Sequence, residues 1–200
     1  MKMSLEAFNI NLFDHLNAPI DASSLMVYFA KFIANDTLYI MLIFLVLSWF
    51  LGNRHNKELA LKAVITTAIA LAIGFTISTV YPHPRPFMID EGRTLIWHAA
   101  DSSFPSDHML IFSSIAFAYL FAKEKQIGLF FFFLAVEVGW SRVYLGVHFP
   151  FDILGGLFVA MFTGFFVQKL WDKYGVLFIN FALSIYHKLF ANFIEKGWIR

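Results

Sequence analysis

The stretch MLIFSSIAFAYLFAKEKQIGLFFFFLAVEVGWS, residues 109–141, decides the fold of this chain. Two apolar runs flank the charged turn KEK at residues 123–125, and the second run contains a single charged residue, Glu137. A bilayer-crossing helix needs about 20 mostly apolar residues, and each half of this hairpin would be about 22 Å long. The pattern predicts two antiparallel membrane helices whose far ends meet at one membrane surface.

The composition of the whole chain agrees with a membrane location. Of its 200 residues, 59% are hydrophobic, 19% are aromatic and only 14% are charged, whereas soluble domains carry about 25% charged residues. This apolar excess excludes a disordered chain, and the net charge of +1 excludes a basic nucleic-acid-binding domain. The absence of cysteine excludes a disulfide framework, a thiolate metal site and a cysteine nucleophile.

The rest of the chain extends the hairpin into a bundle. We expect an all-α fold, a polytopic membrane helical bundle of five to six spans, built as one domain over residues 1–200. A β-barrel would need two-residue alternation of apolar and polar side chains, which the apolar runs lack. The spans are expected near residues 37–53, 61–82, 106–123, 126–142 and 151–170.

Segments near the two chain ends leave alternatives open. Residues 22–35 contain Lys31 and end at Asp36. This favours an interfacial helix, with an additional span or a longer first helix as alternatives. Residues 175–194 carry apolar side chains at helical spacing, and an interfacial helix and a sixth span are equally open. Residues 1–15 lack the apolar core of a secretory signal, so no cleavage is expected there.

Basic residues in the connections predict the orientation. One face holds seven of them and the opposite face three: Arg54, Lys57, Lys62, Lys123, Lys125, Lys169 and Lys173 against Arg85, Arg93 and Arg142. Cytoplasmic connections carry the excess of Lys and Arg, so the first face is expected in the cytoplasm. Residues 82–105 and 142–152 would then face the periplasm or the cell exterior.

Phosphate-binding side chains gather at this outer face. The hairpin geometry brings Ser106 and Arg142 together, and Arg85 follows the preceding helix at the same level. Guanidinium groups match phosphate oxygens and stay charged at any working pH. Ser106 and Asp107 open a helix whose backbone N–H groups and dipole favour an anion. We therefore predict that Arg85, Arg142, Ser106 and Asp107 bind phosphate.

Two histidines and one aspartate belong to the same face. Imidazole can attack phosphorus or deliver a proton near neutral pH. Asp152 lies four residues after His148, and a helix that starts at Pro150 would let its carboxylate reach one ring nitrogen. This arrangement marks His148 as the nucleophile and His108 as the acid. No fourth metal ligand stands out beside these three residues, so we expect no metal site and no cofactor, and activity that survives chelators.

The spacing of these residues resembles a known family. Residues 141–152 match the third signature of the type 2 phosphatidic acid phosphatase (PAP2) family, which reads Ser-Arg, five residues, His, three residues, Asp. Residues 105–108, Pro-Ser-Asp-His, resemble the second signature, Pro-Ser-Gly-His. Arg85-Pro86 resembles the end of the first signature, Lys, six residues, Arg-Pro.

Two positions depart from these signatures. Ser78 stands where the first signature has its lysine, and Asp107 stands where the second has glycine. A carboxylate at position 107 would repel a phosphate dianion unless it faces the helix dipole or pairs with Arg85. Both departures look like the bacitracin-resistance branch of undecaprenyl diphosphatases, which residues 103–108, Ser-Phe-Pro-Ser-Asp-His, closely resemble.

The resemblance implies a metal-independent lipid phosphatase in the bacterial inner (cell) membrane, with its site facing outward. Its substrate would be a polyprenyl diphosphate, hydrolysed to undecaprenyl phosphate and orthophosphate during recycling of the cell-wall lipid carrier. By the same resemblance, His148 forms a phosphohistidine and His108 protonates the leaving phosphate. Asp152 completes the catalytic set.

Other functions and weaker residue signals stay open. The chain would otherwise be another PAP2 phosphatase or phosphotransferase acting on phosphatidic acid, phosphatidylglycerol phosphate or a lipid A phosphate, a small anion transporter, or an inactive lipid-binding relative. Glu137 has equally credible structural and functional interpretations. Histidines 83, 98 and 187 are typical of the solvated interface and receive no role. Three residues of the outer loop suit either substrate contact or interfacial anchoring: Arg93, Trp97 and Asp101.

Overall fold

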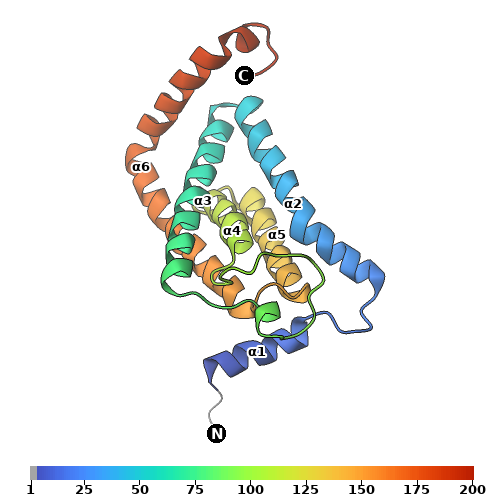
Figure 1. Ribbon diagram of the computed structural model, residues 1–200. Helices are drawn as coiled ribbons and strands as arrows, with labels where there is room; N and C mark the ends of the chain where they lie inside the picture. Colours follow the sequence, from blue (N-terminus) through green and yellow to red (C-terminus); the bar gives the residue numbers. More distant parts are fainter. Residues whose placement is uncertain (1–3) are drawn as a thin grey trace.

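The computed structural model describes residues 4–200, and every regular element in that range is helical. The predicted all-α fold is therefore confirmed. Figure 1 shows the helices, which are α1 (Leu5–Leu16), α2 (Ser24–Phe50), α3 (Arg54–Val80), α4 (Asp107–Phe121), α5 (Lys125–Tyr144) and α6 (Pro150–Glu195), with a 3-10 turn η1 (Pro86–Met88) in the long connection between α3 and α4.

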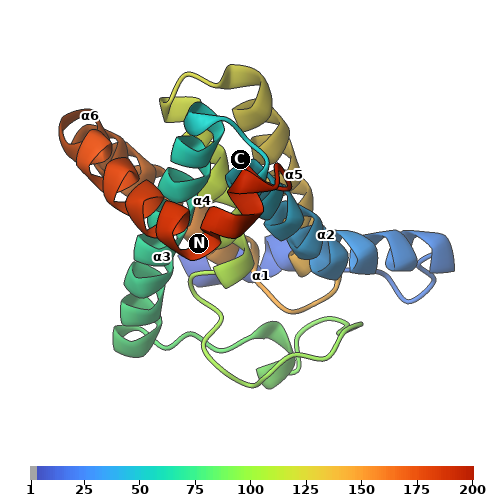
Figure 2. The same cartoon turned by 90° about the horizontal axis from the view of Figure 1, so that it is seen from above.

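Four of these helices, α2, α3, α5 and α6, are long and apolar enough to cross a membrane, and the chain is a multi-pass membrane protein. The fifth apolar helix, α4, has only 15 residues. It packs against α3, α5 and α6 and lies among them in both views (Figures 1 and 2). Because neighbouring helices cover its sides, α4 needs less length than a lipid-exposed span.

Close helix contacts set the position of the predicted site. A Cβ atom at Gly156 of α6 would meet the Met109 Cβ at 2.9 Å and the Ser106 carbonyl oxygen at 3.0 Å. Small residues let membrane helices approach closely. The close approach is continued by a hydrogen bond from the Ser106 N–H to the Asp152 carbonyl oxygen, at 3.1 Å. The first turns of α4 and α6 are thereby joined.

The segments expected at residues 22–35 and 37–53 form one helix, which corresponds to the alternative of a longer first helix. Helix α2 begins after Ser23, whose hydroxyl accepts a hydrogen bond from the Met26 N–H at 3.2 Å, and runs unbroken to Phe50. Its 27 residues are about 40 Å long, which exceeds the hydrocarbon core of about 30 Å. Lys31 and Asp36 divide the apolar run in the sequence, but the helix continues through both residues.

Helix α6 likewise joins the segments expected at 151–170 and 175–194. It has 46 residues, or about 69 Å, with one non-helical residue at Phe190. Beyond the bilayer thickness it continues along the turn between α2 and α3 (Figure 1). There its side chains Ile179, Leu183 and Tyr186 pack against Trp49, Phe50 and Leu61.

Helix α1 lies across the opposite end of the bundle, below the loop that precedes α4 (Figure 1). The Ser4 hydroxyl caps it by accepting a hydrogen bond from the Ala7 N–H at 3.1 Å. Helix α1 packs against α5 and α6. The sequence analysis assigned no helix to this segment, which at 12 residues is too short to cross a membrane.

Candidate active site

The proposed nucleophile lies in the short turn between α5 and α6. His148 is only 2% exposed, and its Nδ1 lies 3.4 Å from the Asp152 Oδ2. The same oxygen accepts a hydrogen bond from the Phe149 N–H at 2.8 Å, so the Asp152 side chain satisfies the N–H of the residue that precedes α6. An ionised carboxylate only accepts, so Nδ1 carries the ring hydrogen and Nε2 carries the lone pair.

The lone pair of His148 faces a guanidinium group. Nε2 lies 3.2 Å from the Arg85 Nη1, which also donates to the Val147 carbonyl oxygen at 2.9 Å. Burial, followed by the charges of Arg85 and Arg142, holds the pKa of His148 well below its ordinary value. The imidazole is therefore neutral at working pH, which is the form that can attack phosphorus.

Arg85 is fixed on every side by neighbours. It is 3% exposed, its Nε donates to the Asp101 Oδ1 at 2.8 Å, and its Nη2 donates to the Ser102 carbonyl oxygen at 3.2 Å. Asp101 is thus its ion-pair partner in this structure. Asp107, which the sequence offered as a possible partner, is exposed as the first residue of α4 and forms no ion pair within residues 4–200.

Arg142 is the least satisfied charged group near the site. It is 2% exposed, and its Nε and Nη2 have no hydrogen-bond partner among the described residues. A buried polar group without a partner is rare, and a buried unpaired charge is costly. Together with Arg85, this guanidinium can receive the oxygens of a phosphate group.

The start of α4 supplies the remaining predicted residues. Ser106 is fully buried, and its hydroxyl caps α4 by accepting a weak hydrogen bond from the Met109 N–H at 3.5 Å. His108 follows in the first turn and is half-buried. The titratable groups near it are Arg142, His148, His98 and Arg85. The structure thus brings all seven predicted site residues to one end of the bundle.

Ser78, which replaces the first-signature lysine, contributes no cation. Its hydroxyl donates to the Phe75 carbonyl oxygen within α3, at 2.9 Å. A histidine of the outer loop, His98, lies beside the proposed nucleophile instead. The His98 ring meets the His148 ring edge to face, with 6.1 Å between centroids, and its Nδ1 lies 3.8 Å from the Asp101 Oδ1.

Sequence reasoning missed two histidines and α1. His98 and His83 received no role, yet both lie within the site cluster. One face of α1 carries Glu6, Asn9, Phe13 and Asn17, and each contacts a site-bearing segment. In the sequence these residues are spaced by three or four positions, and this spacing alone indicates that they share one face of a helix.

The other outer-loop residues anchor the loop. The Arg93 guanidinium donates to the carbonyl oxygens of Pro19 and Ile20, at 2.8 and 3.2 Å, and so ties the loop to the connection between α1 and α2. Trp97 is 89% exposed, as an interfacial anchor would be. Glu137 is half-buried in α5 and forms no hydrogen bond or ion pair within the part of the chain that the structure describes.

Comparisons with known proteins show the family and the fold of this chain. A sequence model described as the PAP2 superfamily matches residues 59–175, more than half of the chain. YbjG of Escherichia coli is 38% identical over 98% of this chain and 99% of its own length. The undecaprenyl-diphosphatase BcrC of Bacillus subtilis is 33% identical over 97% of both chains. The crystal structure of Aquifex aeolicus LpxE has the same fold, with a TM-score of 0.68 at 24% identity, over 84% of this chain and 99% of that one.

Proposed function

The chain belongs to the PAP2 superfamily, and from this premise we propose that it is a membrane lipid phosphatase that hydrolyses undecaprenyl diphosphate to undecaprenyl phosphate and orthophosphate. One observation carries the chemistry: a buried, neutral His148 holds its Nε2 lone pair beside Arg85 and is backed by Asp152. The full-length similarity to BcrC supports the choice of substrate.

The first step transfers the terminal phosphoryl group to His148. Nε2 attacks the terminal phosphorus, a nitrogen–phosphorus bond forms, and the bond from phosphorus to the bridging oxygen breaks. The electron pair leaves with undecaprenyl phosphate, whose oxygen takes a proton from His108. The substrate displaces the contact between Arg85 and Nε2, and the phosphoryl oxygens then bind Arg85 and the unpaired nitrogens of Arg142.

The second step releases orthophosphate. His108, now neutral, takes a proton from a water molecule as the water oxygen attacks phosphorus. The nitrogen–phosphorus bond breaks and returns its electron pair to Nε2. Throughout both steps Asp152 holds the Nδ1 hydrogen of His148 and stabilises the positive charge on the phosphorylated ring.

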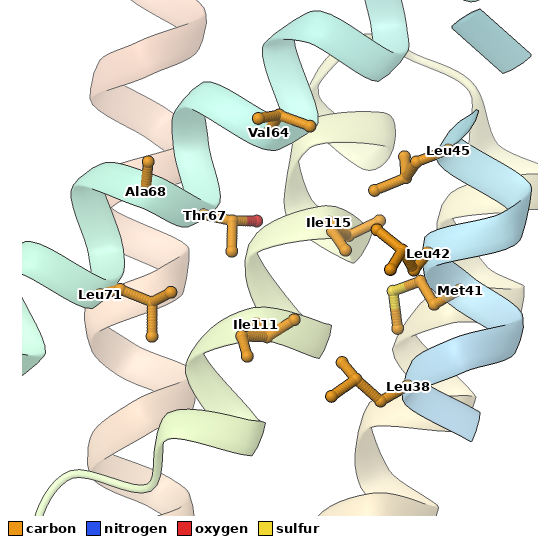
Figure 3. Close-up of a pocket in the computed structure, with 10 residues that line it drawn as sticks. All are labelled: Leu38, Met41, Leu42, Leu45, Val64, Thr67, Ala68, Leu71, Ile111 and Ile115. Carbon is orange, nitrogen blue, oxygen red and sulfur yellow. The ribbon is translucent and has the colours of Figure 1, made fainter. Parts of the chain in front are cut away.

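An apolar groove supports a substrate with a long lipid tail. It has a volume of about 290 Å³ and lies between α2, α3 and α4, as Figure 3 shows. Ile111 in its wall follows the predicted acid His108 by three residues, so both side chains share one face of α4. Isoprenoid chains are apolar and would match the side chains that line the groove: Leu38, Met41, Leu42, Leu45, Val64, Thr67, Ala68, Leu71, Ile111 and Ile115.

We assign the site to the outer face of the bacterial inner membrane. The excess of Lys and Arg in the connections at the opposite end supports this orientation. At that face the enzyme would regenerate the monophosphate form of the carrier that cell-wall synthesis uses. The chain would then contribute to peptidoglycan synthesis and to bacitracin resistance.

Phosphate release by purified protein in detergent tests the function. Wild type and His187→Ala, an exposed histidine at the other end of α6, are expected to release phosphate from undecaprenyl diphosphate with or without EDTA. His148→Ala is expected to release none while it still shows a cooperative thermal unfolding transition. A preference for phosphatidic acid would keep the mechanism and replace the substrate. Anion flux in proteoliposomes without any phosphate release would reject a phosphatase altogether.

A further inference from the structure

Asp152 is shared between two histidines. Its Oδ2 faces the Nδ1 of His148 at 3.4 Å, and its Oδ1 lies 3.8 Å from the Nδ1 of His83. Asp152 is 1% exposed, and its further polar neighbours are the Phe149 N–H, the Ser103 hydroxyl and Arg85. His83 thus lies against the carboxylate oxygen that the nucleophile leaves free.

The hydrogen bonds around His83 define its tautomer. The Ser103 hydroxyl has two acceptors for its one hydrogen, the Pro84 carbonyl oxygen at 3.1 Å and the Asp152 carboxylate. Its oxygen, 2.9 Å from the His83 Nδ1, must then accept the hydrogen of that ring nitrogen. The hydrogen-bearing edge of the imidazole is therefore the one that Asp152 meets.

The ring of His83 has little freedom to move. It stacks on Tyr81 with 6.3 Å between centroids and meets Phe149 edge to face at 5.7 Å. Its Nε2 lies 3.4 Å from the Oε1 of Glu6, so α1 closes the far side of the ring. The side chain is 14% exposed. Glu6, His83, Asp152 and His148 form a continuous row of polar groups that ends at the nucleophile.

We propose that His83 is a positioning residue of the active site, which holds Asp152 through its Nδ1 hydrogen and Ser103 and thereby aligns His148 for attack. This inference rests on the function proposed above. His83 does not touch the reacting atoms. It acts on the rate of phosphoryl transfer, because Asp152 must face Nδ1 as positive charge develops on the His148 ring.

Three substitutions at position 83 distinguish the effect of losing the Nδ1 hydrogen-bond donor from the effect of losing the volume of the ring. The side-chain amide of His83→Asn stands where Nδ1 stands, so this variant keeps the donor to Ser103 and loses the contact with Glu6. His83→Gln reaches the position of Nε2 and lacks the Nδ1 donor. His83→Ala removes both. His187→Ala is the matched control at the distant end of α6.

The measurement is a single-turnover reaction with undecaprenyl diphosphate, in which the amplitude gives the fraction of active protein and the rate constant gives the chemistry. Misplacement of catalytic groups costs up to about 100-fold in rate. We expect a 10- to 100-fold smaller rate constant in His83→Ala and His83→Gln, an unchanged KM, and near wild-type rate in His83→Asn. A smaller amplitude with an unchanged rate constant would reduce His83 to a folding role and overturn the inference.

The outcomes distinguish this inference from the proposed function. If wild type and His187→Ala release no phosphate, the proposed function fails and takes this inference with it. If wild type is active, His148→Ala is inactive and the position-83 variants keep the wild-type rate constant, only the positioning role fails. If His83→Ala does not fold, the pair His83→Asn and His83→Gln carries the test, and equal rate constants for the two would reject the role of the Nδ1 donor.

Discussion

Arg142 is a buried cation of the candidate site whose hydrogen bonds are incomplete. It sits in the last turn of α5, where a cation suits the negative end of the helix dipole. Even so, two of its nitrogens are buried without partners. Removing a buried unpaired charge in favour of an apolar side chain of similar volume is often stabilising. The residue is therefore better explained by an anion than by the fold.

Replacing Arg142 should separate activity from stability. We expect Arg142→Met to lower kcat/KM for undecaprenyl diphosphate by about 100-fold or more, since a donor to the transition-state charge is lost. The thermal unfolding temperature should rise or stay unchanged. Phosphate release and thermal unfolding in the same detergent check both parts. A strong loss of stability would show that Arg142 has a structural partner.

The environment of His148 predicts a pH effect on stability. Burial holds its folded-state pKa well below the ordinary 6.5, so below pH 6.5 the unfolded chain binds a proton that the folded chain does not. Stability should therefore fall as the pH drops from 6.5, by about 1.4 kcal/mol per pH unit for this group alone. His148→Asn should show a shallower fall of the unfolding temperature between pH 6.5 and 5. Equal slopes would mean that His148 titrates normally.

At the scale of elements, α1 supports the turn between α5 and α6 that carries His148. The Asn9 Oδ1 accepts the Phe151 N–H at 3.0 Å, so a side chain of α1 satisfies a free N–H in the first turn of α6. The Phe13 ring meets Phe149 at 5.1 Å between centroids. Asn17 donates to the carbonyl oxygens of Val143 and Tyr144 at the end of α5. These contacts hold both flanks of His148.

Two asparagines on α1 test whether this helix supports the turn that carries His148. Asn9→Ala leaves the buried Phe151 N–H without its acceptor, and an unsatisfied buried donor costs about 1–3 kcal/mol. The unfolding temperature should fall by several degrees, with a parallel loss of phosphatase activity. Asn11→Ala, on the exposed face of the same helix, is the control and should change neither quantity. Equal behaviour of the two variants would remove α1 from the support of the site.

At the scale of the whole molecule, one end of the bundle carries the chemistry and the other carries the basic connections. The segments that carry the site residues, α1 and the loop before α4 lie at one end, while the turn between α4 and α5 lies at the far end of that hairpin (Figure 1). The orientation of the bundle in the membrane decides on which side of the membrane the candidate site meets its substrate.

The chain has no cysteine, so single cysteines can report this orientation directly. A membrane-impermeant thiol reagent should label Trp97→Cys in intact spheroplasts, because that position is 89% exposed in the outer loop. Lys125→Cys, exposed at the opposite end, should be labelled only after the membrane is opened. The reverse pattern would place the site in the cytoplasm and contradict an outward-facing phosphatase.

The sequence by itself determined the helical membrane class, and it predicted the candidate site residues that the structure brings to one end of the bundle. Long apolar runs indicate helices long enough to span a membrane. Arg142 and Asp152 lie on either side of the short turn between α5 and α6, so their closeness follows from local geometry. The short turn at residues 123–125 makes α4 and α5 antiparallel and so predicts that Ser106 and Arg142 lie at the same end of the hairpin. These features depend on neighbours along the chain, which a sequence displays.

Only the tertiary structure decided the contacts between distant segments. It joined residues 22–35 to α2 and 175–194 to α6, because helix continuity depends on backbone hydrogen bonds that a few polar side chains do not interrupt. It paired Arg85 with Asp101 and set His83 against Asp152. Glu6 and His83, or Asn9 and Phe151, lie far apart in the chain, and no periodic pattern links them. Such pairs form only when the bundle packs and the irregular outer loop is held between α1, α4 and α6.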